Sequence, residues 1–180
     1  GNTRSRAAEV EMPTFSLNLV NANNNVHSSN IAIRYDEFIG EGNASENDVE
    51  KVFATSVKES PELYIIAKDG KYASIDVATE DQTIPLGIRI KQEMNVRFEK
   101  SWFKGYSQAI LIDTHTGKEY DLMTKTYTTE KLGVGDIENR FFLNLGEPVI
   151  EDENPEDDNV STDVNEMAAN EINIIVEPDN

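Results

Sequence analysis

The chain has 180 residues, of which 38% are hydrophobic, and a formal net charge of −18. This length suits one medium-sized packed domain with additional segments. So acidic a chain repels polyanions, and we therefore expect no nucleic-acid partner. The chain has no cysteine, which excludes disulfides, thiolate metal sites and cysteine nucleophiles. No apolar run approaches the roughly 20 residues that span a bilayer, so we expect a chain that is not membrane-spanning.

Apolar residues at a period of two indicate β-strands in the first half of the chain. TFSLNLV (14–20) and NIAIRY (30–35) alternate in this way. The asparagine-rich stretch between them suits a turn, because asparagine tolerates left-handed backbone angles. In ELYIIAKDGKYASIDVA (62–78), Asp69 and Gly70 separate two strand-like runs. We predict a two-residue hairpin turn there, with a positive φ at Gly70.

Two stretches depart from simple strand alternation. ENDVEKVFATSV (46–57) follows Ser45, a possible helix cap, and spaces its apolar residues as a helix would, so it predicts at most one short helix. QTIPLGIRI (82–90) is β-branched and apolar but contains Pro85. Because proline lacks the N–H of a strand ladder, Pro85 indicates an edge position or a bulge.

Strand-like stretches continue to about residue 145, and fixed-period repeats are absent. These stretches are MNVRFEKSW (94–102), SQAILID (107–113), EYDLM (119–123), KTYTTE (125–130) and NRFFLNL (139–145). Many short strands with little helix predict an all-β fold. We expect an antiparallel two-sheet β-sandwich of the jelly-roll or immunoglobulin-like kind.

The stretch ILIDTHTGKEYDL (110–122) holds two aspartates, a histidine and a glycine, and could be a calcium loop or a hairpin turn. A calcium loop of the EF-hand type needs glycine at position six and glutamate at position twelve. Counted from Asp113, the glycine comes fifth and Thr124 occupies position twelve. We therefore predict a four-residue turn closed by Gly117 at positive φ, and no metal site.

Arg140 is the last cationic residue of the chain and lies in a segment expected to be a strand near the sheet interior. An arginine in such a place needs carboxylate or carbonyl oxygens, because an unpaired buried charge is strongly destabilising. Asp121 interrupts EYDL without another evident reason. We therefore predict a structural Arg140–Asp121 ion pair with no catalytic part.

Candidate catalytic groups are scarce. The two histidines, His27 and His115, fall in expected turns far apart in the sequence, which makes histidine triads and zinc sites hard to assemble. A pair of carboxylates could act without histidine, but Glu41, Glu46 and Asp48 lie in an expected solvated loop. We predict no catalytic residues, no cofactor and no enzymatic activity.

The aromatic cluster in SWFKGY (101–106) is the one candidate for ligand binding. Trp102, Phe103 and Tyr106 surround a lysine and a glycine. On an exposed loop these rings could stack on sugars or insert into a partner, because they bury a large area at low entropic cost. The alternative is a strand end that caps the core, and we favour that interpretation.

The composition divides the chain into four segments. Residues 1–11 are expected to be a disordered or vector-derived lead, 12–146 the β-sandwich domain, and 147–169 an acidic linker. Residues 147–179 supply twelve of the 34 acidic residues. Residues 170–180 contain a further strand-like run, which must pair with the sandwich, with a following domain or with another molecule.

The order of several motifs carries a family resemblance. The residues concerned are Ser60, Pro61, Leu63, Tyr64, Pro85, Leu86, Gly87, Asp113, Thr116, Gly117, Asp121, Leu122, Glu138, Asn139, Arg140, Phe141 and Leu143. Over about residues 28–146 the chain resembles the β-sandwich domain that precedes the C-terminal sorting domain in surface proteins of Bacteroidetes exported by type IX secretion. NEINIIVEPDN (170–180) resembles the first strand of that sorting domain, although the acidic linker before it is longer than the resemblance implies.

The resemblance implies a secreted or cell-surface location, at the exterior of the outer membrane, and has no catalytic residues to carry over. We expect a non-enzymatic structural or interaction module next to a sorting signal, with other protein domains or surface polysaccharide as partners. The alternative is a carbohydrate-binding module that uses the aromatic loop around Trp102. The ligand and the oligomeric state stay open at this point.

Overall fold

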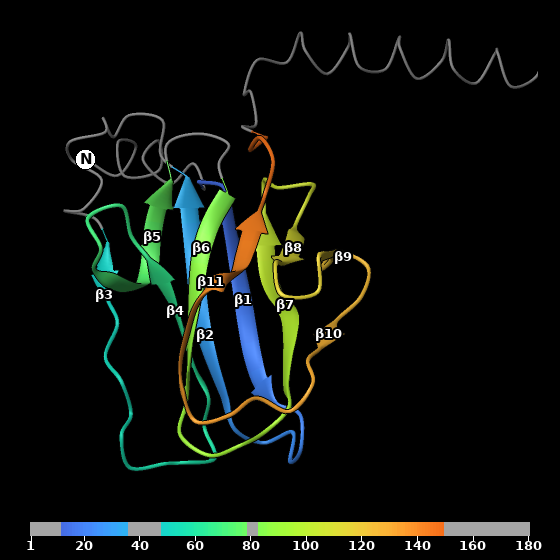
Figure 1. Ribbon diagram of the computed structural model, residues 1–180. Helices are drawn as coiled ribbons and strands as arrows, with labels where there is room; N and C mark the ends of the chain where they lie inside the picture. The colour runs from blue at the N-terminus through green and yellow to red at the C-terminus, as the bar shows by residue number, and fades with distance from the viewer. Residues whose placement is uncertain (1–11, 36–47, 79–82, 150–180) are drawn as a thin grey trace, which may run out of the picture. The chain divides into compact units, whose positions relative to one another are not determined.

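The structure is a computed structural model that describes residues 12–35, 48–78 and 83–149. Its regular elements are strands (Figure 1), which confirms the predicted all-β class. The strands are β1 (Thr14–Asn21), β2 (Ser28–Tyr35), β3 (Val49–Glu50), β4 (Glu62–Ile66), β5 (Tyr72–Ala78), β6 (Thr83–Ile90), β7 (Val96–Lys104), β8 (Ile110–Asp113), β9 (Lys118–Asp121), β10 (Tyr127–Thr128) and β11 (Gly135–Asn144).

The strands form one continuous mixed sheet rather than two separate sheets. Their order is β10-β7-β1-β2-β5-β4-β6-β11-β8-β9, with β3 beside β5, and the sheet curls until it is nearly closed into a barrel. The pairing of β2 with β5 is parallel, whereas the other strand pairs are antiparallel. The expected two-sheet sandwich is therefore not confirmed.

Strand β5 joins two halves of this sheet. Its first residues, Tyr72 and Ala73, pair with β4, and its later residues, from Ile75 onward, pair with β2. One half is then β10-β7-β1-β2 and the other is β4-β6-β11-β8-β9. Figure 1 shows β3 and β5 at one side of the sheet and β9 and β10 at the other. At that second side the rings of Tyr120 and Tyr127 stack with centroids 3.8 Å apart.

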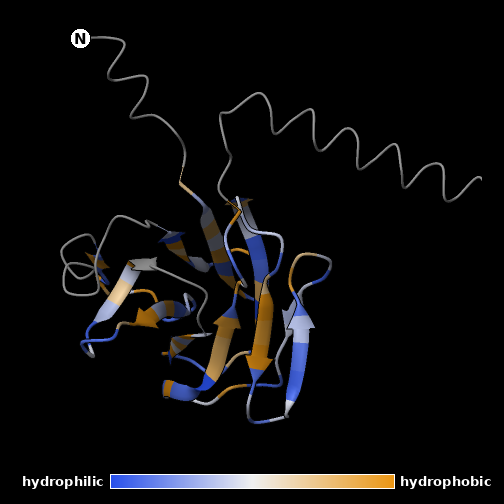
Figure 2. Cartoon of the chain, turned by 90° about the horizontal axis from the view of Figure 1, so that it is seen from above, coloured by the Kyte–Doolittle hydropathy of each residue, from blue (hydrophilic) through white to orange (hydrophobic). Residues whose placement is uncertain are grey.

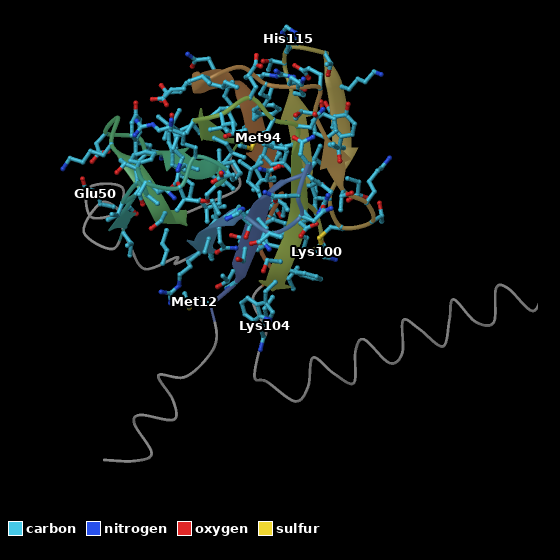
Figure 3. The ribbon with its side chains drawn as sticks, turned by 90° about the horizontal axis from the view of Figure 1, so that it is seen from below. Met12, Glu50, Met94, Lys100, Lys104 and His115 are labelled. Atoms are coloured by element: carbon cyan, nitrogen blue, oxygen red, sulfur yellow. The ribbon has the colours of Figure 1, made fainter. Side chains whose placement is uncertain are left out.

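The core lies between the inward faces of these strands. Alternation along each strand places apolar residues inside and polar residues outside, and Figure 2 shows this as alternating hydropathy along single strands. Met94 is 1% exposed and points into the interior in Figure 3. Fully buried side chains of the core include Phe15, Leu17, Leu19, Ile31, Ile33, Leu63, Ile65, Leu86, Ile88, Phe98 and Phe141.

The predicted short helix is wrong for the described part of ENDVEKVFATSV. Val49–Glu50 instead forms β3, and the following residues have no regular structure. Val52 is 83% exposed, whereas Phe53 packs edge-on against Tyr64 with ring centroids 5.3 Å apart. Pairing with β5 outweighs the weak helical preference of these residues. Ser45, the expected cap, lies outside the described residues.

The turn glycines adopt the conformations that the sequence predicts. Gly70 has a φ of 86° and Gly117 a φ of 74°. The first hairpin differs in detail, because Ala67 pairs with Lys71 and three residues separate them. A single left-handed glycine closes such a loop, so the two-residue turn is wrong. Asn25, in the asparagine-rich turn, has a φ of 59°.

Pro85 lies in β6, which has neighbours on both sides in the sheet. The neighbour β4, however, pairs only with residues from Leu86 to Arg89. At Pro85 itself the ladder therefore continues on the β11 side alone, opposite Phe142. This local edge accommodates a residue without an N–H, as the sequence indicates.

The chain divides into two units, Gly1–Ile150 and Glu151–Asn180. The second unit lies outside the described residues, and so do most of the expected acidic linker and the expected strand at 170–180. Within the part of the chain that the structure describes, no helix is long and apolar enough to cross a membrane.

Candidate functional site

Arg140 forms the buried ion pair that the sequence predicts, but with a different partner. Its Nε and Nη2 donate to Oδ1 and Oδ2 of Asp113 over 2.9 and 3.0 Å. Strand β11 lies beside β8, where Asp113 pairs with Phe141. The predicted partner, Asp121, ends the next strand and accepts a hydrogen bond from the Met123 N–H over 2.9 Å. The Arg140–Asp121 pair is therefore wrong, and Asp121 stabilises a turn.

Two further side chains complete this cluster. Glu130 accepts two hydrogen bonds from Arg140, of 2.9 and 3.0 Å, and the Tyr127 hydroxyl donates to Asp113 over 2.7 Å. Asp113 is fully buried. Burial alone would raise the pKa of Asp113, but the hydrogen bonds from Arg140 and Tyr127 outweigh it and lower that pKa. We call Asp113, Tyr127, Glu130 and Arg140 the arginine cluster.

A second buried carboxylate is paired in the same manner. Glu62 is 3% exposed and lies 3.1 Å from the ammonium of Lys51 and 3.0 Å from that of Lys91. The Ser29 hydroxyl accepts a hydrogen bond from Lys51 and another from the Leu63 N–H. Among the described residues, no buried side-chain nitrogen or oxygen lacks a hydrogen-bond partner. Both buried carboxylates therefore contact cationic side chains, as buried charged groups require.

The stretch ILIDTHTGKEYDL is a hairpin turn between β8 and β9. The Gly117 N–H donates to the Asp113 carbonyl over 2.8 Å, and His115 lies at the tip of the turn, pointing away from the sheet (Figure 3). His27 lies in a different turn, between β1 and β2, beside Asn24. Within the described ranges, no group of three His, Cys, Asp or Glu residues could hold a metal ion.

The three aromatic residues of SWFKGY do not form one platform. Trp102 is 52% exposed and Phe103 is 36% exposed, whereas Tyr106 is 5% exposed and belongs to the core. Phe103 pairs with the buried Phe15 and therefore lies on the core side of β7. The Lys100 ammonium lies 4.9 Å from the centroid of the Phe103 ring. Trp102 alone among the three presents an exposed ring on the outside of the sheet.

A β-bulge decides the direction of Trp102. Strict alternation from Phe98, which is buried, would direct Trp102 toward the core. The register of β7 against β1 shifts, however, so that Leu17 pairs with Lys100 and Ser16 pairs with Trp102. One extra residue on a strand reverses the side-chain direction beyond it. The bulge therefore places Trp102 on the same face as Ser16, away from the core.

This outward face extends across three neighbouring strands. Ser16 and Asn18 of β1 lie beside Asn30 of β2, whose amide nitrogen donates to the Ser16 hydroxyl over 2.8 Å and to Asn18 Oδ1 over 2.6 Å. Further along, Thr14 pairs with Arg34 of β2 and with Lys104 of β7. Figure 3 shows Lys104 at the end of the sheet where β1 begins, near Met12. The outer face is defined here as Thr14, Ser16, Asn18, Asn30, Arg34, Trp102 and Lys104.

The outer face differs from the rest of the chain in its charge. Strands β1 and β2 contain no aspartate or glutamate and one cationic residue, Arg34, which is exposed. On β7, Arg97 is already paired with Glu99 over 3.1 Å. Glu99 pairs with Asn18 and therefore lies on the same face as the outer-face residues of β1. The surface around the single tryptophan thus carries the Arg97–Glu99 ion pair beside the exposed Arg34.

Of the outer-face residues, only Trp102 was predicted from the sequence as a candidate for ligand binding. The polar residues that accompany it were overlooked. In TFSLNLV, Ser16 and Asn18 alternate with apolar residues, and this pattern indicates that both side chains lie on the outward face of one strand. The asparagine-rich turn indicates that β1 and β2 are neighbours, but no sequence signal places β7 beside β1. Trp102 could therefore not be placed near Asn30 and Arg34.

Comparisons with family models, with curated proteins and with solved structures found no match to this chain. The resemblance to the domain of type IX-secreted surface proteins stays an expectation from the sequence motifs.

Proposed function

We propose that this chain is a non-enzymatic structural and interaction module of a secreted or cell-surface protein. The observation that carries the proposal is the contrast between its buried and exposed polar groups. The buried carboxylates Asp113 and Glu62 are each held by cationic side chains. A general acid or base needs a group that can exchange a proton with substrate. The carboxylates of Asp113 and Glu62 already contact cationic side chains and are buried.

We also propose that the chain stands next to a type IX sorting signal, at the exterior of the outer membrane. Several residues that carry the resemblance contact one another in this fold and have structural roles. Asp113 binds Arg140, and Tyr64 lies against Gly87 and donates to Glu138 over 2.6 Å. These contacts support a module whose shared motifs maintain the fold, while exposed surfaces contact partners.

In finer detail, we propose that the fold is a variant of a two-sheet sandwich. The two halves of the sheet meet through backbone pairing at β5 and through side chains at Tyr120 and Tyr127. Such an arrangement is what a sandwich becomes when one strand belongs to both of its sheets. We propose the jelly-roll or immunoglobulin-like kind for this sandwich.

A hydrolase screen tests the absence of catalysis. The full chain should release no product from panels of glycoside, ester and peptide substrates. Glu130→Gln is the diagnostic variant, because the Glu130 side chain is 52% exposed and its loss should leave the fold intact. Turnover that disappears in Glu130→Gln at an unchanged melting temperature would show that the arginine cluster is catalytic. Antibody labelling of intact cells of the source organism tests the surface location.

Carbohydrate binding is the second candidate, and the exposure of Trp102 favours it. A tryptophan ring that is half exposed on a sheet face can stack on a sugar ring. The site differs from the one expected from the sequence, because Tyr106 is buried and Phe103 faces the other side of β7. Any such site must therefore use Trp102 together with residues of β1 and β2.

A further inference from the structure

We propose that the edge of β7 that faces away from β1 pairs with the same edge of a second copy of this chain, in an antiparallel, two-fold symmetric dimer. The segment concerned is residues 99–104, which we call the β7 edge. This inference goes beyond the proposed function, which names no partner surface. Three observations support it: the direction of the backbone groups, two exposed aromatic rings and a self-complementary charge pattern.

Strand β10 covers only the beginning of this side of β7. It pairs with Arg97 and Phe98, and among the described strands the rest of β7 has a neighbour on the β1 side alone. The side chains at residues 101–103 are exposed. A strand edge that is open in this way can pair with a strand of another chain.

Two residues of the β7 edge direct their backbone N–H and C=O groups away from β1. The carbonyl oxygens of Val96 and Gly105 each accept a hydrogen bond from a backbone N–H outside β1. Because backbone groups alternate in direction along a strand, steps of two from Val96 lead to Lys100, and one step back from Gly105 leads to Phe103. The bulge between them supplies the extra residue. Among the described residues, neither Lys100 nor Phe103 has a backbone partner on that side.

This spacing suits a second copy of the same strand. An antiparallel copy centred between Ser101 and Trp102 places Lys100 of one copy opposite Phe103 of the other, on both sides of the two-fold axis. In each of these pairs the two residues can exchange N–H to C=O hydrogen bonds. A two-fold dimer uses the same patch on both copies, and the β7 edge meets that requirement.

The side chains agree with the same register. The rings of Trp102 and Phe103 are exposed, and pairing of the two edges would remove part of both from water. The Lys100 ammonium already lies 4.9 Å from the ring centroid of Phe103 in the same chain. In the dimer these two side chains also become cross-strand neighbours, and the two Trp102 rings become diagonal neighbours on the outward side.

The charges favour the antiparallel orientation. Glu99, which also binds Arg97, and Lys104 stand at opposite ends of the β7 edge. Antiparallel pairing places Glu99 of each copy opposite Lys104 of the other, whereas parallel pairing in register brings like charges together.

The overall charge makes the dimer weak without excluding it. The described residues contain 14 lysines and arginines and 15 aspartates and glutamates, so the part of the chain that meets its copy is nearly neutral. The formal net charge of −18 still makes two full chains repel each other. A small contact between two strand edges suits weak association.

Two features of β7 protect strand edges in many other proteins. A bulge and an inward-pointing charge commonly prevent edge pairing. In β7, however, the Lys100 ammonium donates to the Met123 carbonyl over 3.3 Å and therefore does not extend across the edge. The bulge leaves the two outward backbone positions symmetric about the segment's centre.

Disulfide trapping tests the register, because the chain has no cysteine. In the proposed dimer the two Ser101 residues are diagonal neighbours across the axis, within the Cα separation of roughly 4.4–6.8 Å that a disulfide spans. The full chain with Ser101→Cys should form a covalent dimer under mild oxidation. His115→Cys, in the exposed turn between β8 and β9, is the control and should form one at least tenfold more slowly.

Association of the unmodified chain is measured independently. Sedimentation at concentrations up to about 1 mM, the range for weak contacts, should show a dimer that dissociates on dilution. The emission of Trp102, the single tryptophan, should move to shorter wavelength over the same range. Added sodium chloride should strengthen association, because it screens the repulsion between the two acidic chains.

Two variants at one position separate backbone pairing from ring burial. Phe103→Ala and Phe103→Pro both remove the ring, but only proline also lacks the N–H that would bond to the second copy. That N–H faces away from β1, so an edge proline leaves the pairing with β1 in place. Phe103→Ala should weaken dimerisation severalfold, and Phe103→Pro should abolish it. Circular dichroism shows whether each variant is folded, and the disulfide experiment decides if the proline variant is not.

Three results would each overturn the dimer. They are a wild type that stays monomeric at about 1 mM in high salt, equal trapping rates for Ser101→Cys and His115→Cys, and equal association of folded Phe103→Ala and Phe103→Pro. Each of them leaves the non-enzymatic module of the proposed function intact, because the hydrolase screen measures catalysis separately.

Discussion

The arginine cluster and the outer face use the same kinds of side chain for opposite purposes. In the cluster, the guanidinium of Arg140 lies between two carboxylates, and the Arg140 side chain is 12% exposed. On the outer face, Arg34 and Trp102 are exposed to solvent. Burial, and not residue type, separates the groups that stabilise this fold from the groups available to a partner.

The difference follows from where each region lies in the sheet. Asp113 and Arg140 lie where β8 and β11 pair and where Tyr127 stacks on Tyr120, so neighbouring elements exclude water from Asp113 and from most of Arg140. In such surroundings an unpaired charge is strongly unfavourable, and every charged group needs a partner. The outward residues of β1 are partly exposed, and their polar groups are hydrogen-bonded to Asn30 and carry no charge.

Arg140→Met should have the largest effect on stability. It leaves the fully buried Asp113 without its cation, which should lower the free energy of unfolding by about 3–5 kcal/mol. Arg34→Met on the outer face is the matched control and should change it by less than about 0.5 kcal/mol. Chemical denaturation of both variants checks this, and equal effects would abolish the distinction between the two regions.

The Asp113–Arg140 pair should also make the free energy of unfolding depend on pH. The pKa of Asp113 is lowered in the folded state, so its stabilising contribution is complete above the unfolded pKa of about 3.9 and is lost as pH falls through the folded value. The stability gap between the wild type and Arg140→Met should therefore narrow as pH falls from 7 to below about 4. Denaturation curves measured across this range check the sign, which a widening gap would contradict.

Gly87→Ala should have the next largest effect. A Cβ at Gly87 would lie 2.1 Å from Cε2 of Tyr64, a buried ring, so the ring must move and its hydrogen bond to Glu138 is disturbed. Overpacking of this kind costs about 1–3 kcal/mol. Gly133→Ala, where nothing lies within 4 Å, is the control and should be nearly neutral. Thermal unfolding of the two variants measures the difference.

Gly117→Val should destabilise through the backbone alone. Nothing lies within 4 Å of a Cβ there, but the φ of 74° is unfavourable for an L-residue. The expected loss is about 1–2 kcal/mol. Gly117→Asn should lose less, because asparagine tolerates this region. Equal losses in the two variants would show that the turn relaxes to another conformation.

Trp102→Ala should have the smallest effect on stability, within about 0.5 kcal/mol of the wild type. Its ring is half exposed and outside the core, so its removal leaves no cavity. The melting temperature of Trp102→Ala, compared with that of the wild type, checks this prediction. A large loss of stability would show that the Trp102 side chain stabilises the fold.

The arginine cluster illustrates how far sequence reasoning reaches toward a site. The sequence indicates that Arg140 must have a buried anionic partner, because its segment alternates as an interior strand. It does not indicate which aspartate lies across from it, since Asp113 and Asp121 both end strands of the same hairpin. Only the pairing of β11 with β8 selects Asp113.

Most of the strands, most of their inward faces and the left-handed turn glycines follow from the sequence, because period-two alternation and positive φ are local properties. Strand β3, in a stretch with helical spacing, and Trp102, beyond the bulge in β7, are the exceptions. The tertiary structure alone decided the parallel pairing of β2 with β5, the partner of Arg140 and the outward direction of Trp102. Each of these depends on register between segments distant in the chain. One bulged residue in β7 reverses a side chain between core and solvent, and local sequence patterns contain no information about that shift.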